Sequence, residues 1–240
     1  MPKFFEDAFS AQTPYLKGTH ANHIGRSLRM RVGEPLTVCA CGIDYECTIA
    51  DITADTVFLD IISSAPCCAE PTIRVTLYQA LPKADKLEQI IQKSVELGVT
   101  EIVPVLTARC ISRLSAKDFE KKRARLQNIA MNAAQQSGRG IIPKIAPLHT
   151  LEEAAKSASN LEYSLVCYEA EGGISFSEVP KNCADYGVFI GAEGGFDESE
   201  VVLLRQHDIT PVWLGKRILR CETAPLTALS VLMFHTGNLN

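Results

Sequence analysis

The sequence predicts an α/β fold in which a small β-rich domain precedes a domain built on a parallel sheet. Residues 1–70 contain short β-rich runs separated by turn signals, whereas residues 71–240 alternate apolar runs with amphipathic helical segments. The two patterns meet at SSAPCCAEP, which has two prolines and small residues and suits a linker. We therefore predict a barrel-like β domain over 1–70 and a second domain over 71–240.

The composition is that of a folded protein without a membrane span. The chain has 240 residues, of which 46% are hydrophobic and 22% charged. No apolar run reaches the roughly 18 residues that a span requires, and no signal-peptide pattern is present, so we expect a cytoplasmic location. The nine cysteines suit a reducing compartment, and the spacing of Cys39 with Cys41 and of Cys67 with Cys68 does not fit zinc. We expect neither a disulfide framework nor a metal site.

The elements of the N-terminal part follow from short β-branched runs. EPLTVCACG, YECTIADI and TVFLDII are separated by Gly, Asp and Asn, and a short helix is predicted around 19–28. In the second part, five nearly continuous apolar runs predict strands that are buried on both faces: 73–80, 99–106, 163–169, 186–192 and 210–215. A ligand crevice is expected beyond the carboxyl ends of these strands.

Helix-start signals lie between the predicted strands. A capping residue followed by Glu three positions later predicts a capping box, and this spacing occurs three times: Asp85 with Glu88, Thr150 with Glu153, and Asp197 with Glu200. Two more helices are predicted, one that opens near Ser115 and one over 223–235.

Basic residues are concentrated in two places on an acidic chain. The formal net charge is -4, yet the stretch 109–144 holds nine Lys and Arg against two acids, and Arg26, Arg29 and Arg31 form a second cluster. Such clusters are either solvated helix faces or contacts to a polyanion. Two separate clusters favour a polyanionic partner.

The loop IGAEGGFDESE follows the predicted strand 186–192. Gly191, Gly194 and Gly195 either let a ligand approach the backbone closely or only reverse the chain. The spacing matches neither the dinucleotide nor the P-loop pattern, and Glu193 would repel a phosphate. A ligand with polar edges and no phosphate fits better, and S-adenosylmethionine is one.

The loop LGKRILRCETAPLTAL follows the predicted strand 210–215 and precedes the last helix. It contains Arg217, Arg220, Glu222 and Thr223. Arg220 and Glu222 either form a surface ion pair or, if the preceding strands are neighbours, lie at the same sheet edge as the glycine loop. A site would form at that edge.

Four strings occur in a fixed order and spacing: KLEQIIQKSVELGV, AAQQSGR, IGAEGGF and LGKRILRCETA. Together they resemble the RsmE-type ribosomal RNA methyltransferases of the SPOUT superfamily. HANHIGRSLRMRVGEPL is similar to the PUA-like β-barrel domain with which that family binds RNA. The family usually has Pro where this chain has Ala192, Thr where it has Cys221, and commonly Arg near the position of Lys3.

The resemblance implies a SPOUT-type trefoil-knotted parallel-sheet domain, a homodimer and S-adenosylmethionine as cofactor. It implies methylation of N3 of a uridine in small-subunit (16S) ribosomal RNA. Three loops would hold the cofactor, through Tyr168, Glu169, Ile190, Gly191, Glu193, Gly194, Gly195, Leu214, Gly215, Ile218, Leu219, Thr223 and Ala224. The candidates for a part in catalysis are Arg220, Glu222 and Glu193.

Five arginines are the candidate RNA contacts: Arg26, Arg29, Arg109, Arg113 and Arg139. The last three are equally interpretable as structural caps or ion pairs. An acyl hydrolase is disfavoured, because no G-x-S-x-G elbow is present and the histidines lie outside both loops. A non-catalytic RNA-binding adaptor with the same fold stays open as the alternative.

Overall fold

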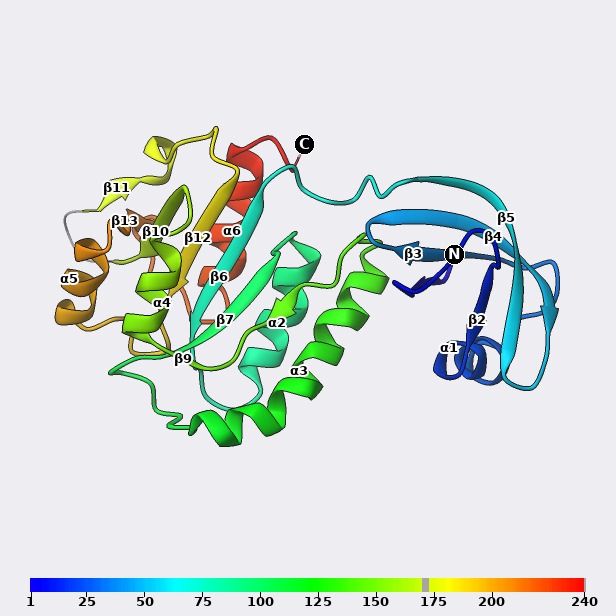
Figure 1. The fold of residues 1–240 in the computed structure, drawn as a ribbon. Helices are drawn as coiled ribbons and strands as arrows, with labels where there is room; N and C mark the ends of the chain where they lie inside the picture. The colour runs from blue at the N-terminus through cyan, green and yellow to red at the C-terminus, as the bar shows by residue number, and fades with distance from the viewer. Residues whose placement is uncertain (170–172, 240) are drawn as a thin grey trace. The chain divides into compact units, whose positions relative to one another are not determined.

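The computed structural model describes residues 1–169 and 173–239, and the chain divides into two compact units (Figure 1). Unit 1 consists of Met1–Glu70 together with Ala134–Ile141, and unit 2 consists of Pro71–Ala133 and Ile142–Asn240. The predicted fold class is confirmed, because unit 1 is built on a small curled β-sheet and unit 2 on a parallel sheet with helices.

Unit 1 contains a five-stranded sheet in the order β1-β3-β4-β5-β2. Its strands are β1 (Lys3–Phe5), β2 (Tyr15–Lys17), β3 (Pro35–Ala40), β4 (Ile43–Ile52) and β5 (Thr56–Pro66). β1 pairs parallel to β3, and the other pairs are antiparallel. The predicted helix is α1 (Thr19–Asn22), which continues as a π-helical turn over His23–Ser27. Ile24 from this turn packs with Leu16, Val38 and Val57 in the core of the unit.

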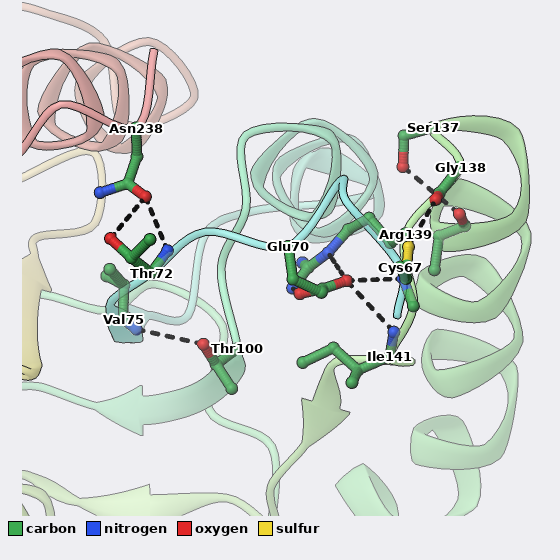
Figure 2. A network of polar contacts seen from close by, with 12 residues as sticks. Cys67, Glu70, Thr72, Val75, Thr100, Ser137, Gly138, Arg139, Ile141 and Asn238 are labelled. Carbon is green, nitrogen blue, oxygen red and sulfur yellow. Dashed lines mark hydrogen bonds and ion pairs between the residues drawn. The ribbon is translucent and has the colours of Figure 1, made fainter. Parts of the chain in front are cut away.

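A segment from the middle of the chain, Ala134–Ile141, belongs to unit 1 and is held there by Glu70 (Figure 2). The Glu70 carboxylate accepts hydrogen bonds from Nη2 of Arg139 at 2.7 Å and from the backbone nitrogens of Gly140 and Ile141 at 2.7 and 3.1 Å. The Arg139 side chain is only 2% exposed. This burial favours the ion-pair interpretation of Arg139 over the RNA contact.

Two further side chains hold the same segment by its carbonyl groups. Lys3 donates from Nζ to the oxygen of Gly138 at 2.9 Å, and the Cys39 thiol donates to the oxygen of Gly140 at 3.2 Å. Lys3 also forms an ion pair of 2.8 Å with Asp44. The segment is therefore part of the interior of unit 1.

Unit 2 contains an eight-stranded parallel sheet, with the strand order β11-β13-β10-β12-β6-β7-β8 and β9 paired with β7. The long strands are β6 (Arg74–Ala80), β7 (Glu101–Leu106), β10 (Tyr163–Cys167), β12 (Asp185–Ile190) and β13 (Thr210–Trp213). They lie where the apolar runs predicted them. The short strands β8 (Lys144–Ile145), β9 (His149–Thr150) and β11 (Ile174–Ser175) were not predicted, because two residues are too few for a pattern.

The helices of unit 2 follow the predicted start signals with one exception. They are α2 (Lys86–Glu96), α3 (Ala116–Gln136), α4 (Leu151–Ala158), α5 (Glu198–Gln206) and α6 (Ala224–His235), and a 3-10 turn spans Phe176–Glu178. The capping boxes at Thr150 and Asp197 are confirmed. The predicted box at Asp85 is wrong, because Glu88 pairs with Arg125 at 2.8 Å instead of returning to Asp85. Among the described residues, no helix is long and apolar enough to cross a membrane.

Loss of the Arg139 guanidinium should destabilise unit 1. Arg139→Ala leaves the largely buried Glu70 carboxylate without its cation, so we expect the free energy of unfolding to fall by about 3–5 kcal/mol. Lys121→Ala is the control, because it breaks an exposed pair with Asp118 and should cost about 0–1 kcal/mol. Urea unfolding followed by circular dichroism measures both. Equal, small losses would show that the Glu70 pair contributes little.

Candidate cofactor and active site

The predicted loops are brought together because three parallel strands are neighbours. β10 lies between β12 and β13, and Val166 pairs with Phe189 on one side and with Pro211 on the other. The carboxyl ends of the three strands therefore meet at one edge of the sheet. The loops that follow them are Tyr168-Glu169, 191–195 and 214–223. β12 and β13 are not direct neighbours, since β10 separates them.

A pocket lies between the first and third of these loops, at the edge of the sheet where their strands end. Its lining is Cys167, Tyr168, Glu169, Trp213, Leu214, Gly215, Arg217, Ile218, Leu219 and Ala224. Cys167, Trp213 and Arg217 were not among the expected contacts. Cys167 and Trp213 end their strands and Arg217 lies within the third loop, so extending the predicted loops by one strand residue would have found the first two.

The remaining expected cofactor residues lie outside this lining. Ile190 is buried at the end of β12, and Thr223 is exposed at the N-cap of α6. The glycine loop forms a tight turn, in which the nitrogen of Gly195 donates to the oxygen of Ala192 at 3.0 Å. A Cβ added at Gly195 would lie 3.1 Å from Oε1 of Glu169, so the turn packs against the pocket wall.

Of the three glycines in the loop, Gly191 has the least room for a side chain. A Cβ at this position would lie 2.8 Å from the Cα of Gly195, which is closer than real Cβ contacts. Gly194 is less restricted, because its added Cβ would meet the Arg109 side chain at 3.1 Å. The lack of a side chain at Gly191 thus allows its backbone to approach the backbone of Gly195.

Arg109 braces the glycine loop from outside. Its Nη1 donates to the oxygen of Gly194 at 3.0 Å, and its Nη2 forms an ion pair of 3.2 Å with Asp197 at the start of α5. The same helix start is tied down by Glu200, which accepts from the backbone nitrogens of Ala108 at 2.6 Å and Asp197 at 2.8 Å. These contacts favour the structural role for Arg109 that the sequence left open beside RNA binding.

Two of the three catalytic candidates meet at a lysine that the sequence reasoning missed. Nζ of Lys86, the first residue of α2, lies 3.2 Å from Oε1 of Glu193 and 3.0 Å from Oε2 of Glu222. The hydrogen bond from Lys86 lowers the pKa of Glu222 to about 2, and burial raises the pKa of the neighbouring Cys221 to about 12. At neutral pH the cluster is therefore one ammonium, an ionised Glu222 beside Glu193, and a protonated thiol.

Arg220 does not join this cluster. Its side chain is exposed, and its carbonyl oxygen accepts from the nitrogens of Thr223 and Ala224 at 2.8 and 2.9 Å, which closes the turn before α6. Within the residues that the structure describes, Glu222 is paired with Lys86, so the expected alternative of an Arg220–Glu222 ion pair is wrong. The guanidinium of Arg220 remains at the solvent side of the loop.

The predicted basic stretch is less positive than its composition suggests. Six of its nine basic residues form ion pairs: Arg109 with Asp197, Lys121 with Asp118, Arg123 with Glu120, Arg125 with Glu88, Arg139 with Glu70, and Lys144 with Glu101. Arg113, Lys117 and Lys122 are exposed, and Arg113 donates to the oxygen of Ala108 at 2.6 Å. In unit 1, Arg26 and Arg29 are both exposed.

The pocket residues fit S-adenosylmethionine in chemical character. Leu214, Leu219 and Trp213 provide apolar wall, and the Glu169 carboxylate suits a ligand with hydroxyl groups and a positive charge. Beneath the loop, the side-chain oxygen of the buried Gln79 has no hydrogen-bond partner among the described residues, while its amide nitrogen donates to Gly191 at 3.4 Å. The described residues contain no group of three metal-ligating side chains.

Fold and site together define an RNA methyltransferase. Residues 69–233 match the model of the RNA methyltransferase domain, and residues 16–62 match the model of the RNA methyltransferase PUA domain. The chain belongs to the family of the ribosomal RNA small subunit methyltransferases E. It is 36% identical over 235 residues to the Bacillus subtilis (strain 168) member, which covers 94% of this chain and 91% of the relative.

Two solved structures extend the similarity to the cofactor. A ribosomal RNA small subunit methyltransferase E from Neisseria gonorrhoeae, solved with S-adenosylmethionine, has a TM-score of 0.86 at 29% identity and covers 98% of this chain and 97% of its own. A Legionella pneumophila protein described as a methyltransferase, also solved with this cofactor, has a TM-score of 0.87 at 31% identity with the same coverage. The chain is thus an S-adenosylmethionine-dependent methyltransferase with the SPOUT fold.

Substitution of Gly191 should weaken cofactor binding. In Gly191→Ala the new methyl group would overlap the backbone of Gly195, so the turn must open, and we expect the dissociation constant for S-adenosylmethionine to rise at least about tenfold. Gly25→Ala is the control, because that position has open space. Isothermal titration calorimetry gives both affinities. A folded Gly191→Ala protein with the affinity of the wild type would rule this loop out of the cofactor site.

Proposed function

We propose that the protein transfers a methyl group from S-adenosylmethionine to N3 of a uridine in small-subunit ribosomal RNA, as a cytoplasmic homodimer. The observation that carries the proposal is the pocket at the carboxyl edge of β10, β12 and β13, in a chain whose relatives are named for the small-subunit RNA. The division of labour is RNA binding by 1–70 and methyl transfer by 71–240. Exposed apolar side chains support a dimer: Ile218 is 86% exposed and Phe234 68%.

The cofactor supplies an electrophilic methyl group on a sulfonium when it is bound. The residues of the chain then have to hold the acceptor base in line at near-attack distance, and orientation of this kind lowers a barrier by several kcal/mol. Tyr168, Glu169 and the loop from Leu214 to Ala224 would form the binding wall. The closed turn at Gly191 would exclude water from its side.

Uracil N3 carries a proton that must leave before or during the transfer. Glu222 is a poor base for this step, because a pKa of about 2 leaves its carboxylate with little affinity for a proton. We assign Glu222 and Glu193 a structural role, in which their ion pairs with Lys86 hold the two loops together. Arg220 is exposed and not engaged by either carboxylate, and a fixed cation stabilises the negative charge that uracil gains as N3 loses its proton.

RNA contacts are proposed for the exposed arginines alone. Arg26 and Arg29 in unit 1 and Arg113 in unit 2 have solvent-facing side chains. Guanidinium groups bind phosphate and stack on bases, which suits RNA with unstacked nucleotides. Arg109 and Arg139 are not included, since both are committed to ion pairs.

A methylation assay tests the proposed function. Small ribosomal subunits that lack the modification are incubated with the protein and S-adenosylmethionine, and the RNA nucleosides are separated by mass spectrometry. We expect 3-methyluridine. In the same assay at saturating cofactor, Arg220→Ala should be slower by roughly a hundredfold, because it removes the cation that would stabilise the ionising base. Arg220→Lys should lose less, because it keeps the charge.

Three results would contradict these assignments. Bound RNA with no methyl transfer by the wild type would favour the non-catalytic adaptor. A methyl group on another atom would contradict the N3 position. A full-rate Arg220→Ala enzyme would leave Arg220 as loop structure only, and Lys181→Ala, which removes an exposed cation outside the three loops, is the control.

Charge reversal in unit 1 should weaken RNA binding. Arg26→Glu with Arg29→Glu is expected to raise the dissociation constant for RNA and to lower the slope of log affinity against log salt by up to about 2, roughly one for each phosphate that the protein no longer neutralises. Lys156→Glu with Lys181→Glu changes the net charge equally at exposed positions of unit 2 and is the control. Filter binding over a salt series measures both. Identical behaviour of the two variants would indicate a non-specific charge effect.

A further inference from the structure

Lys86 lies at a place where a helix disfavours a cation. It is the first residue of α2, directly after the N-cap Asp85. The free N–H groups of a first turn carry partial positive charge, so acidic residues are favoured there and lysine is not. The position of this ammonium is therefore explained by what it contacts outside its own helix.

The contacts of Lys86 join two loops that are far apart in sequence. Glu193 comes from the loop after β12 and Glu222 from the loop after β13, and Nζ of Lys86 lies 3.2 and 3.0 Å from their carboxylates. The same Nζ lies 3.7 Å from Sγ of Cys221. Because both carboxylates lie within 3.2 Å of the same ammonium, they are close to each other and would repel each other if the ammonium were absent.

Both carboxylates are built into the cofactor loops. Glu193 belongs to the tight turn that is closed by Ala192 and Gly195 and packed against Glu169. Glu222 lies between Leu219 and Ala224, which line the pocket. A second bond ties the glycine loop to the segment before α2, because the backbone nitrogen of Lys83 donates to Oε1 of Glu193 at 3.0 Å.

We propose that Lys86 is a positioning residue that locks the glycine loop and the loop before α6 into one cofactor-binding arrangement, through its ion pairs with Glu193 and Glu222. It acts through the two carboxylates and not by touching the cofactor. Its role in methyl transfer rests on the proposed function, whereas its role in cofactor affinity rests on the loops alone.

Three variants test the proposal in the full-length protein. Lys86→Met removes the ammonium at similar side-chain length, and we expect S-adenosylmethionine to bind about tenfold to a hundredfold more weakly, because the loops separate. Lys86→Arg should stay close to the wild type, since it can still bridge two carboxylates. Lys93→Met is the matched control in the same helix, where the ammonium pairs with Glu96 of that helix at 2.8 Å. Calorimetry gives the affinities, and melting temperatures report stability.

Removal of the carboxylates distinguishes a bridge from a direct ligand contact. In the Lys86→Met background, Glu193→Gln with Glu222→Gln abolishes the repulsion, so part of the cofactor affinity should return. A direct contact between Lys86 and the cofactor predicts no recovery. A recovery of cofactor affinity would show that Lys86 is energetically coupled to the two carboxylates. A protein that was only destabilised would not regain affinity in this way.

The pH dependence of binding gives a second readout. The ion pair with Lys86 keeps the pKa of Glu222 at about 2, against an ordinary value of 4.5, so wild-type affinity should not change through its titration between pH 5 and 7. In Lys86→Met the carboxylates face each other without a cation, which raises the pKa of one of them. Affinity of this variant should therefore improve as the pH falls toward 5, relative to the wild type.

The outcomes separate this proposal from the proposed function. Lys86→Met with wild-type affinity at all pH values would overturn the locking role even if the enzyme methylates RNA. If Lys86→Met binds the cofactor more weakly and the double Gln substitution restores the affinity, the locking role is supported even if no RNA is methylated. If Lys86→Met does not fold, Glu222→Gln alone breaks the same link, and unchanged affinity in that variant would also overturn the proposal.

Discussion

The parallel pairing of β10 with β12 on one side and β13 on the other is the constraint on which the site depends. Parallel strands point their carboxyl ends to the same edge, so three segments separated by about twenty residues each end next to one another. Every element of the pocket follows from this arrangement. Tyr168 and Glu169 lie in the middle because β10 is the middle strand. A different strand order would leave the glycine loop and the loop before α6 without a shared wall.

Electrostatics then decide how the converging loops are held. The glycine loop and the loop before α6 each carry a carboxylate that a cation from elsewhere in unit 2 engages. Arg109 binds the glycine loop at Gly194 and the start of α5 at Asp197, and Lys86 binds Glu193 and Glu222. Lys86, Glu193 and Glu222 are partly shielded from water, so their ion pairs are screened less than the exposed pair of Arg109 with Asp197. Six of the nine basic residues in 109–144 form ion pairs, so most of the positive charge in the middle of the chain contributes to the fold.

Unit 1 shows that order along the chain and order in space differ. Ala134–Ile141 lies between two stretches of unit 2 in sequence, yet it belongs to unit 1 through the Glu70 network (Figure 2). The chain therefore passes between the units at three covalent connections, not at one. A fragment that ends at residue 70 would lack the partner of Glu70. Unit 1 is therefore completed by a segment that comes after Pro71–Ala133 of unit 2 in the chain.

Local patterns in the sequence determined the long strands of unit 2 and most helix starts, because continuous apolar runs and capping boxes depend on neighbours within a few residues. They also indicated the glycine loop, since a missing side chain is visible in any sequence. Only the tertiary structure decided which cations pair with which carboxylates. Glu88 pairs with Arg125 instead of capping α2, and Glu222 pairs with Lys86 instead of Arg220. The buried Arg139 pairs with Glu70. Ion pairs between residues far apart in sequence leave no periodic signal, so their choice depends on the folded backbone that brings them within reach.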